Sequence, residues 1–304
     1  MALNNLRQVL NDEAAPVVIG GMVLDINATP SAVANPRTTT PGKLGAKPFM
    51  ISAVGFDLAG SLLLEHWESE GLSVAGIQRK QDIETAVICH IFDGTGEVAA
   101  GVASVEAIEK FLTPEWIHNF KFNICSAPIL MVDANLGPAA LVACCKMAAE
   151  CQTSVWFEPV SVTKSKRVAS ILKYITFTSP NEDELVAMAN ALSSGDKFLP
   201  IQRDCGSLKL SVDSLFQALK PAIWVLLEKV VRLTGAGDCL VGGAVASICA
   251  GLDIMQSLAV GIASAKGAVE TETNVPAEYD LTKISDDAAS VYSAAKVIFC
   301  ESKL

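Results

Sequence analysis

Histidine and basic residues are scarce in this sequence, and their scarcity excludes several classes of function. The chain has 304 residues with 3 His, and its 23 Lys and Arg stand against 33 Asp and Glu, for a formal net charge of −10. A protein that binds nucleic acid needs basic surface to neutralise phosphates, so we expect no nucleic-acid partner. The few histidines, and the absence of a G-x-S-x-G segment, argue against a Ser-His-Asp hydrolase.

Long apolar runs and paired cysteine motifs are also lacking. Although 51% of the residues are hydrophobic, no run approaches the ~18–20 apolar residues that a membrane span requires, so we expect no membrane segment. The polar and charged stretch from Met1 to Ala15 does not resemble a signal peptide. The 9 Cys are scattered without a C-x-x-C pair. This argues against a zinc site, and we interpret the cysteines as buried reduced thiols of an intracellular protein.

Apolar strand-like segments alternate with helical ones along the chain. Strands are expected at 16–26, 128–133, 155–158, 175–178 and 223–227, and helices at 57–71, 137–150, 166–172, 235–250, 254–270 and 285–298. Such alternation is typical of parallel βαβ units, and it predicts an α/β sheet with helices on both faces.

The stretch from 85 to 102 departs from this alternation. Two strand-like segments, 85–92 and 97–102, flank Asp93-Gly94-Thr95-Gly96, a sequence typical of a hairpin turn. Short antiparallel strands inserted in an α/β fold often form a flap beside the site. Because no linker or internal repeat is evident, we expect one domain over residues 1–304, with lid strands around 22–40 and 85–102.

Two motif matches do not fit their structural context. Gly94 to Ala99 fits G-x-G-x-x-A, but a dinucleotide fingerprint has to open a helix, whereas this segment alternates as a strand does. A nicotinamide-dependent oxidoreductase is therefore not favoured. Ser161 to Lys164 fits S-x-x-K without any companion motif, and a Walker P-loop is absent.

The segment Thr234-Gly235-Ala236-Gly237-Asp238 carries the strongest chemical signal. Its three small residues let a backbone approach a ligand closely, and they lead into an apolar helix whose first N–H groups are unpaired. Such a turn suits a phosphoryl group in transit, and Asp238 could accept a proton from an attacking hydroxyl. The alternative is a glycine-rich turn in which Asp238 merely caps the helix.

Two weaker signals lie at the ends of other expected strands. Asn181 and Glu184 follow a strand and Pro180, where they could organise Mg²⁺ and phosphate, although acidic residues favour the first turn of any helix. Asp25 follows Gly20-Gly21 and the first strand, where a carboxylate could accept two sugar hydroxyls. A solvated turn aspartate is the alternative there.

Taken in order, these segments resemble the ribokinase-like (pfkB) family of carbohydrate and nucleoside kinases. T-G-A-G-D-x-x-x-G-G resembles the C-terminal signature of that family, and Asn181-x-x-Glu184 resembles its magnesium and phosphate motif. Gly55-x-Asp57-x-x-Gly60 and the stretch from 261 to 276 are similar to family segments as well. The resemblance implies a three-layer α/β/α sandwich, with a mostly parallel central sheet and a small β lid.

The resemblance also implies a reaction, the transfer of the ATP γ-phosphoryl group to a primary hydroxyl. Asp238 would be the base, and Gly235, Ala236 and Gly237 would form the anion hole. Asp25, Gly20 and Gly21 would bind the sugar, Glu184 would hold Mg²⁺ through water, and the nucleotide would lie near Asn181, Thr234, Gly261 and Asn274. The implied cofactors are ATP and Mg²⁺, and a monovalent cation such as K⁺ stays open. Relatives often dimerise through the lid, which suggests a homodimer.

Two family segments are missing from this chain. The G-G-x-x-x-N motif does not occur where Pro41-Gly42-Lys43-Leu44 runs straight into Gly45, and the T-x-G-x-x-G-like nucleotide loop is absent between 227 and 234. Because the flanking sequence keeps the family pattern, we hypothesise a splice or gene-model variant that lacks two blocks of an active kinase. A non-catalytic variant that only binds ligand is the alternative.

Finer resemblance points to a substrate and a location. The stretches from Val17 to Asp25 and from Thr38 to Gly42 are most similar to plant pseudouridine kinases, which phosphorylate the nucleoside 5′-hydroxyl. Ribose, fructose and adenosine are the alternative substrates. The terminal Ser302-Lys303-Leu304 resembles a peroxisomal address read by an import receptor. We therefore expect a peroxisomal enzyme, or a cytoplasmic one if the address is not read.

Overall fold

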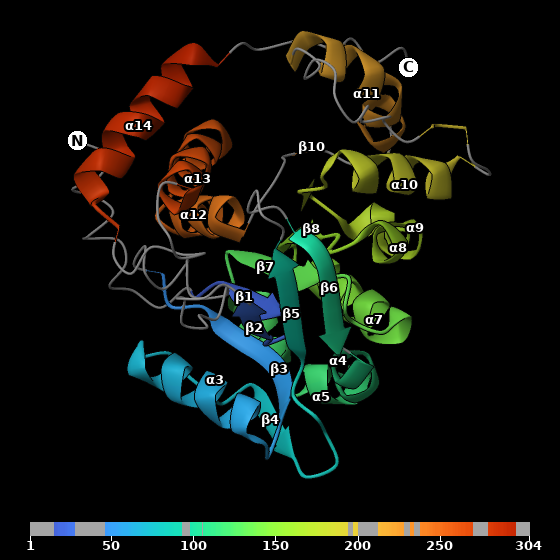
Figure 1. Ribbon diagram of the computed structural model, residues 1–304, viewed down its shortest axis with the longest axis vertical. Helices are drawn as coiled ribbons and strands as arrows, with labels where there is room; N and C mark the ends of the chain where they lie inside the picture. Colours follow the sequence, from blue (N-terminus) through green and yellow to red (C-terminus); the bar gives the residue numbers. More distant parts are fainter. Residues whose placement is uncertain are drawn as a thin grey trace.

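Seven parallel strands form the main sheet of the computed structural model, which describes residues 15–27, 46–92, 98–104, 106–193, 197–199, 212–227, 232–233, 238–269 and 279–295. The strand order is β10-β9-β8-β7-β1-β3-β4, and every pairing is parallel (Figure 1). The strands are β1 (Val17–Ile19), β3 (Phe49–Gly55), β4 (Ile77–Lys80), β7 (Ile129–Asp133), β8 (Ser154–Glu158), β9 (Phe177–Thr178) and β10 (Arg232–Leu233).

Alternate residues of these strands supply two different cores. Leu130 and Val132 of β7 belong to the larger apolar cluster, whereas Ile129 belongs to a cluster on the opposite face, with Met131 packed against it. This is the two-residue period of a strand that is buried on both sides. The prediction of a sheet covered on both faces is therefore confirmed.

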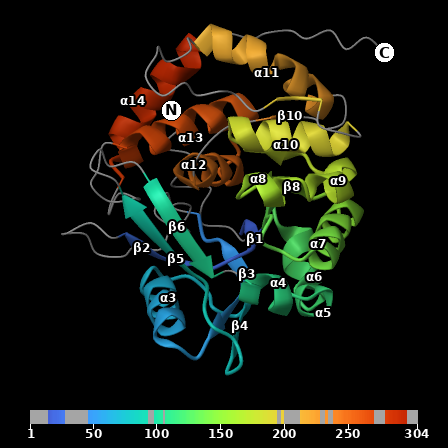
Figure 2. The same cartoon turned by 45° about the vertical axis from the view of Figure 1, so that its right-hand side comes forward.

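Helices cover each face of the sheet, giving the predicted three layers (Figure 2). The larger cluster draws on α4 (Glu106–Phe111), α5 (Pro114–His118), α6 (Lys121–Ser126), α7 (Pro138–Glu150), α9 (Val168–Ile171), α10 (Glu182–Leu192) and α11 (Val212–Leu227). The other face is covered by α3 (Leu58–Ser69), α12 (Asp238–Cys249) and α13 (Ile254–Val269), and α14 (Leu281–Ala294) packs outside α13. The expected helix at 166–172 contains the short helix α9 and the start of a 3₁₀ turn (Leu172–Tyr174), and a further short helix, α8 (Val162–Ser165), precedes it.

A second sheet of three strands stands apart from the main one. It consists of β2 (Leu24–Asn27), β5 (Val87–Phe92) and β6 (Val98–Ser104), in the order β2-β5-β6. β5 and β6 pair antiparallel, which confirms the predicted hairpin, and β2 joins β5 in parallel. The turn expected at residues 93–96 lies outside the described residues.

One expected strand is a helix. Residues 223–227 form the last part of α11, which runs from Val212 to Leu227. Leu219, Ala222 and Leu226 are buried in the larger cluster, at the three- and four-residue spacing of a helix face. A short apolar run looks the same in a buried strand and in a buried helix, and for this reason the prediction was wrong.

The cysteine interpretation also needs a correction. Cys125 at the end of α6 and Cys151 after α7 form a disulfide bond in the structure. Of the other described cysteines, Cys144, Cys145 and Cys239 are buried free thiols and Cys249 is a partly buried one. The two bonded residues meet because α6 packs beside α7, a contact that 26 residues of sequence separation conceal.

The segment Gly55-x-Asp57-x-x-Gly60 forms the turn between β3 and α3. The Asp57 carboxylate caps the helix by accepting the Gly60 N–H (2.7 Å), and it also accepts the N–H and hydroxyl of Thr85 (2.7 and 2.6 Å). Burial raises the pKa of Asp57, but these hydrogen bonds outweigh it and hold the pKa below 3.8. A Cβ at Gly60 would lie 2.5 Å from the Gly55 carbonyl oxygen, so glycine is needed there.

No helix in the described parts of the chain is long and apolar enough to cross a membrane.

Replacing Asp57 by alanine should lower the free energy of unfolding by about 1–2 kcal/mol at neutral pH, because a helix cap and two bonds to Thr85 are lost. The deficit should shrink as the pH falls through the lowered pKa, since protonation removes the same contribution from the wild type. Denaturant unfolding measures both effects. Asp82→Ala, at an exposed turn position, is the matched control. Equal stability of the two variants would contradict this account of the turn.

Candidate active site

The loops that follow β1, β7, β8, β9 and β10 all lie at one edge of the main sheet, because the carboxyl ends of parallel strands meet there. Gly20-Gly21 follow β1, Asp133 ends β7 and Glu158 ends β8. Asn181 follows β9, and Asp238 begins α12 shortly after β10. Asn181 and Gly20-Gly21 thus follow strands that end at the edge where α/β proteins bind ligands, whereas Asp25 lies in β2 of the second sheet and residues 234–237 lie outside the described part of the chain.

The two glycines after β1 leave room for neighbouring side chains. A Cβ on Gly20 would lie 2.3 Å from Asp133 Oδ2, and one on Gly21 would lie 2.3 Å from Ile108 Cδ1. The Gly21 N–H donates to Asp133 Oδ2 at 2.9 Å. Asp25 lies in β2 opposite Ile88 of β5, and its side chain is outside the described part of the structure.

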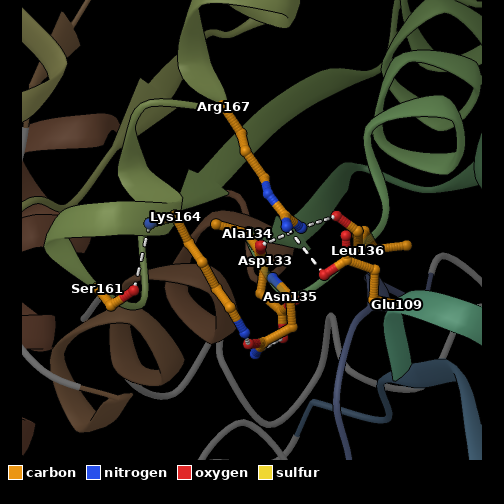
Figure 3. Close-up of polar contacts among 8 residues, drawn as sticks. All are labelled: Glu109, Asp133, Ala134, Asn135, Leu136, Ser161, Lys164 and Arg167. Atoms are coloured by element: carbon orange, nitrogen blue, oxygen red, sulfur yellow. Dashed lines mark hydrogen bonds and ion pairs between the residues drawn. The ribbon is translucent and has the colours of Figure 1, made fainter. Parts of the chain in front are cut away.

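Asp133 is the centre of a polar network that the sequence analysis missed (Figure 3). Besides the Gly21 N–H, its carboxylate accepts the backbone N–H of Asn135 (2.8 Å) and the Asn135 side-chain amide (3.2 Å). Lys164 Nζ donates to Asn135 Oδ1 at 2.7 Å. The residue keeps some accessible surface, yet protein atoms crowd its carboxylate, and this burial raises the pKa of Asp133 above 3.8.

Arg167 fixes the same loop from another side. Its guanidinium donates to the carbonyl oxygens of Ala134 and Leu136 and forms an ion pair with Glu109 at 2.9 Å. One signal was available in the sequence, since Asp133 ends an apolar strand just as Asp25 follows one. What the sequence could not show is that Asp133 meets Gly21 and that Asn135 meets Lys164.

Asn181 and Glu184 form a reciprocal capping box at the start of α10. Asn181 Oδ1 accepts the Glu184 N–H (2.9 Å), and Glu184 Oε2 accepts the Asn181 N–H (3.0 Å). Glu184 is 6% exposed, and burial raises its pKa above 4.5. The helix-capping alternative is thus what the structure shows locally. It leaves Glu184 Oε1 outside the box, and a single carboxylate suits Mg²⁺ that is held mainly by phosphate oxygens.

The Ser179 hydroxyl links the ends of β8 and β9 beside α10. Trp156 Nε1 donates to Ser179 Oγ at 2.9 Å, and Ser179 in turn donates to Glu158 Oε2 at 2.5 Å. Glu158 therefore lies between the loop after β7 and the start of α10. Within the described ranges, no three His, Cys, Asp or Glu residues are grouped as a metal site would require.

Asp238 is the first residue of α12, as expected for the residue that follows a glycine-rich loop. Thr234, Gly235, Ala236, Gly237 and Asn274 lie outside the described residues. Gly261 is buried where α13 crosses α12: a Cβ there would lie 2.5 Å from the Leu240 carbonyl oxygen. Gly243 of α12 faces Gly261: a Cβ added to Gly243 would lie 3.0 Å from the Cα of Gly261. Close helix packing therefore accounts for glycine at 261 without a nucleotide.

The family model described as pfkB family carbohydrate kinase matches residues 40–202. A pseudouridine kinase from Arabidopsis thaliana is 44% identical over 374 aligned positions, which cover 93% of this chain and 98% of that protein. The chain belongs to the pfkB carbohydrate kinase family. A pseudouridine kinase from Escherichia coli is 25% identical, with 77% of each protein covered.

Solved structures agree on the fold. A putative ribokinase II from E. coli superposes with a TM-score of 0.69 at 14% identity, covering 91% of this chain and all of that one. An Arabidopsis ribokinase complexed with ribose and ATP gives a TM-score of 0.66 at 13% identity, covering 91% and 99%. The predicted ribokinase-like sandwich is confirmed, and so is the predicted enzyme class, a kinase phosphotransferase.

The Arabidopsis alignment also bears on the missing blocks. It spans 374 positions, more than the 304 residues of this chain, so the relative has internal positions without a counterpart here. This agrees with the hypothesis that family segments are absent. It also gives a context for α11, because the helix occupies residues where the family resemblance placed a strand before the nucleotide loop.

Gly261→Ala should destabilise the protein by about 1–3 kcal/mol, because the added methyl group forces α13 away from the Leu240 carbonyl. Gly267→Ala lies on the same helix, where a Cβ would meet Tyr279 at an ordinary 3.5 Å. It should be neutral or stabilising by up to about 1 kcal/mol through helix propensity. Thermal unfolding compares the two variants, and a destabilisation of similar size in both would contradict the packing account of Gly261.

Proposed function

We propose that this chain catalyses, or derives from an enzyme that catalyses, ATP-dependent phosphorylation of the 5′-hydroxyl of pseudouridine, giving pseudouridine 5′-phosphate. The observation that most strongly supports this proposal is the 44% identity to a pseudouridine kinase over 93% of the chain. The start of α12 at Asp238, shortly after edge strand β10, supports it, because the family resemblance implies that this turn takes part in phosphoryl transfer.

In the proposed mechanism, Asp238 accepts the proton of the 5′-hydroxyl while that oxygen attacks the γ-phosphorus. A new O–P bond forms, the bond to the bridging oxygen of ADP breaks, and ADP leaves with that electron pair. Gly235, Ala236 and Gly237, with the first N–H groups of α12, offset the charge of the transferring group. Mg²⁺ would neutralise phosphate charge.

Other residues would bind and orient the substrates. Asp25 would accept sugar hydroxyls, with Gly20 and Gly21 shaping the turn before it. Thr234, Asn181 and Asn274 would face the nucleotide, and Glu184 would hold a water on Mg²⁺. Gly261 would contribute by letting α12 and α13 pack closely. A monovalent cation such as K⁺ would bind near the nucleotide, as the family resemblance implies.

Further features belong to the same proposal. The chain would form one domain, with the sheet β2-β5-β6 as its lid and a homodimer built through that lid. Ser302-Lys303-Leu304 would direct the protein to the peroxisome by binding the import receptor.

A second candidate function is nucleoside or nucleotide binding without turnover. The specific observation in its favour is the Arabidopsis alignment, which is longer than the chain. It is tested alongside the first, because ligands stabilise a fold whether or not they react.

ADP release should be fastest with pseudouridine in a panel with uridine, adenosine, ribose and fructose. Asp238→Asn should lower turnover at least ~10²-fold through loss of the base. Asp286→Asn, on the exposed side of α14, is the matched control and should retain full activity. A chain with both missing blocks restored should exceed this one. Full activity in Asp238→Asn would overturn the mechanism, and ligand-induced stabilisation without turnover would favour the binding-only candidate.

A fluorescently tagged protein that ends in Ser302-Lys303-Leu304 should be imported into peroxisomes, because the receptor reads a free C-terminal tripeptide. One residue added after Leu304 should abolish import, which microscopy with a peroxisomal marker would show. Import that persists in the extended protein would contradict this assignment.

A further inference from the structure

The chain leaves the main sheet between Gly20 and Leu24, and two polar side chains hold it there. β1 ends at Ile19, and β2 of the second sheet begins at Leu24. β1 lies between β3 and β7, so this crossing has one neighbouring strand on each side. Each neighbour contributes one of the polar side chains, Ser52 from β3 and Asp133 from β7.

Ser52 holds the crossing from the β3 side. It is fully buried, its hydroxyl donates to the Gly20 carbonyl at 2.7 Å, and its Oγ accepts the Met22 N–H at 3.1 Å. The single hydroxyl thus provides hydrogen bonds for the Gly20 carbonyl and the Met22 N–H, two backbone groups that lie outside the strand pairing of β1. Met22 itself is 1% exposed and packs with Met50 in the apolar cluster beneath α3. This packing anchors the crossing on the α3 face of the sheet.

Asp133 holds the crossing from the β7 side. It accepts the Gly21 N–H, the backbone group between the two that Ser52 satisfies. The positive charge of Lys164 acts on this carboxylate, and Lys164 also donates to Asn135. The hydrogen-bond donors to Asp133 are the backbone N–H groups of Gly21 and Asn135 and the Asn135 side-chain amide. A carboxylate crowded by protein in this way lowers stability unless it is well paired. Three N–H groups and the Lys164 charge compensate Asp133, and one of those N–H groups belongs to the crossing, so the carboxylate holds the crossing in place.

We propose that Ser52 and Asp133 form a clamp on both sides of the crossing, and that this clamp positions β2, the strand that carries Asp25. Only three residues, 21–23, separate the clamped Gly20 from β2, so fixing the crossing fixes where residue 25 lies relative to the main sheet. The inference deepens the proposed function and rests on it. Both side chains are positioning residues, because they act on the substrate through the backbone that carries Asp25.

The test compares Ser52→Ala and Asp133→Asn with Thr153→Val. Thr153 is also a buried residue, and its hydroxyl donates to the Ile124 carbonyl at 3.0 Å, but it lies at the amino end of β8, the opposite edge of the sheet. Ser52→Ala removes a hydroxyl that makes two backbone hydrogen bonds, and Asp133→Asn replaces a carboxylate that accepts three N–H groups by a neutral amide. Thr153→Val removes a hydroxyl that makes one such bond. A purely structural role predicts lower stability in all three variants, with no selective loss of pseudouridine affinity in Ser52→Ala and Asp133→Asn.

We expect both clamp variants to bind pseudouridine about tenfold more weakly, with an equal rise in KM, because a mispositioned strand loses roughly one hydrogen bond to substrate. The KM for Mg-ATP should be unchanged, and Thr153→Val should alter neither constant. Backbone amides 21–27 should exchange with deuterium faster in the clamp variants only. Faster exchange with unaltered pseudouridine affinity would overturn the proposal, and so would an equal weakening for ATP.

The outcomes separate this inference from the proposed function. If the wild-type chain neither binds nor phosphorylates pseudouridine, the proposed function fails, and the exchange of amides 21–27 still decides whether the clamp exists. If Asp133→Asn does not fold, Ser52→Ala carries the test, since it removes a neutral hydroxyl and changes no charge. Unchanged exchange in a folded Ser52→Ala variant would then refute the clamp.

Discussion

The parallel pairing of β1 with both of its neighbours is the constraint on which the candidate site depends. Parallel strands place all their carboxyl ends at one edge, so Gly20, Asp133, Glu158 and Asn181 come together although 161 residues separate the first from the last. The same pairing buries both faces of the sheet. This in turn requires helices on each side and leaves that edge free for polar loops.

Several polar side chains that are crowded by protein lie near this edge. Asp133 and Glu184 both have pKa values raised by burial, and both accept backbone N–H groups that begin or turn a segment of chain. Ser52 and Ser179 add hydroxyls that bridge between strands. Such groups fix backbone geometry near the strand ends, and that geometry is what a transferase needs in order to hold two substrates in line.

The β10 end of the sheet differs from what the family resemblance led us to expect. β10 has two residues, and α11 continues to Leu227 where family resemblance led us to expect a strand. The sandwich nevertheless superposes on the putative ribokinase II from E. coli with a TM-score of 0.69, because the layers depend on apolar faces that this chain has. Fold and catalytic competence are therefore separate questions for this chain. Turnover with and without the blocks addresses the second.

Local sequence determined much of this protein. Glycine and aspartate at 55, 57 and 60 specify the turn into α3, Asn181 and Glu184 specify a capping box, and alternating apolar segments specify a parallel sheet, because each pattern acts over a few residues. Only the tertiary structure decided that residues 223–227 are helical, that Cys125 reaches Cys151, and that Asp133 meets Gly21. Those outcomes depend on contacts between segments far apart in the chain, and the pattern around a single residue carries no record of such contacts.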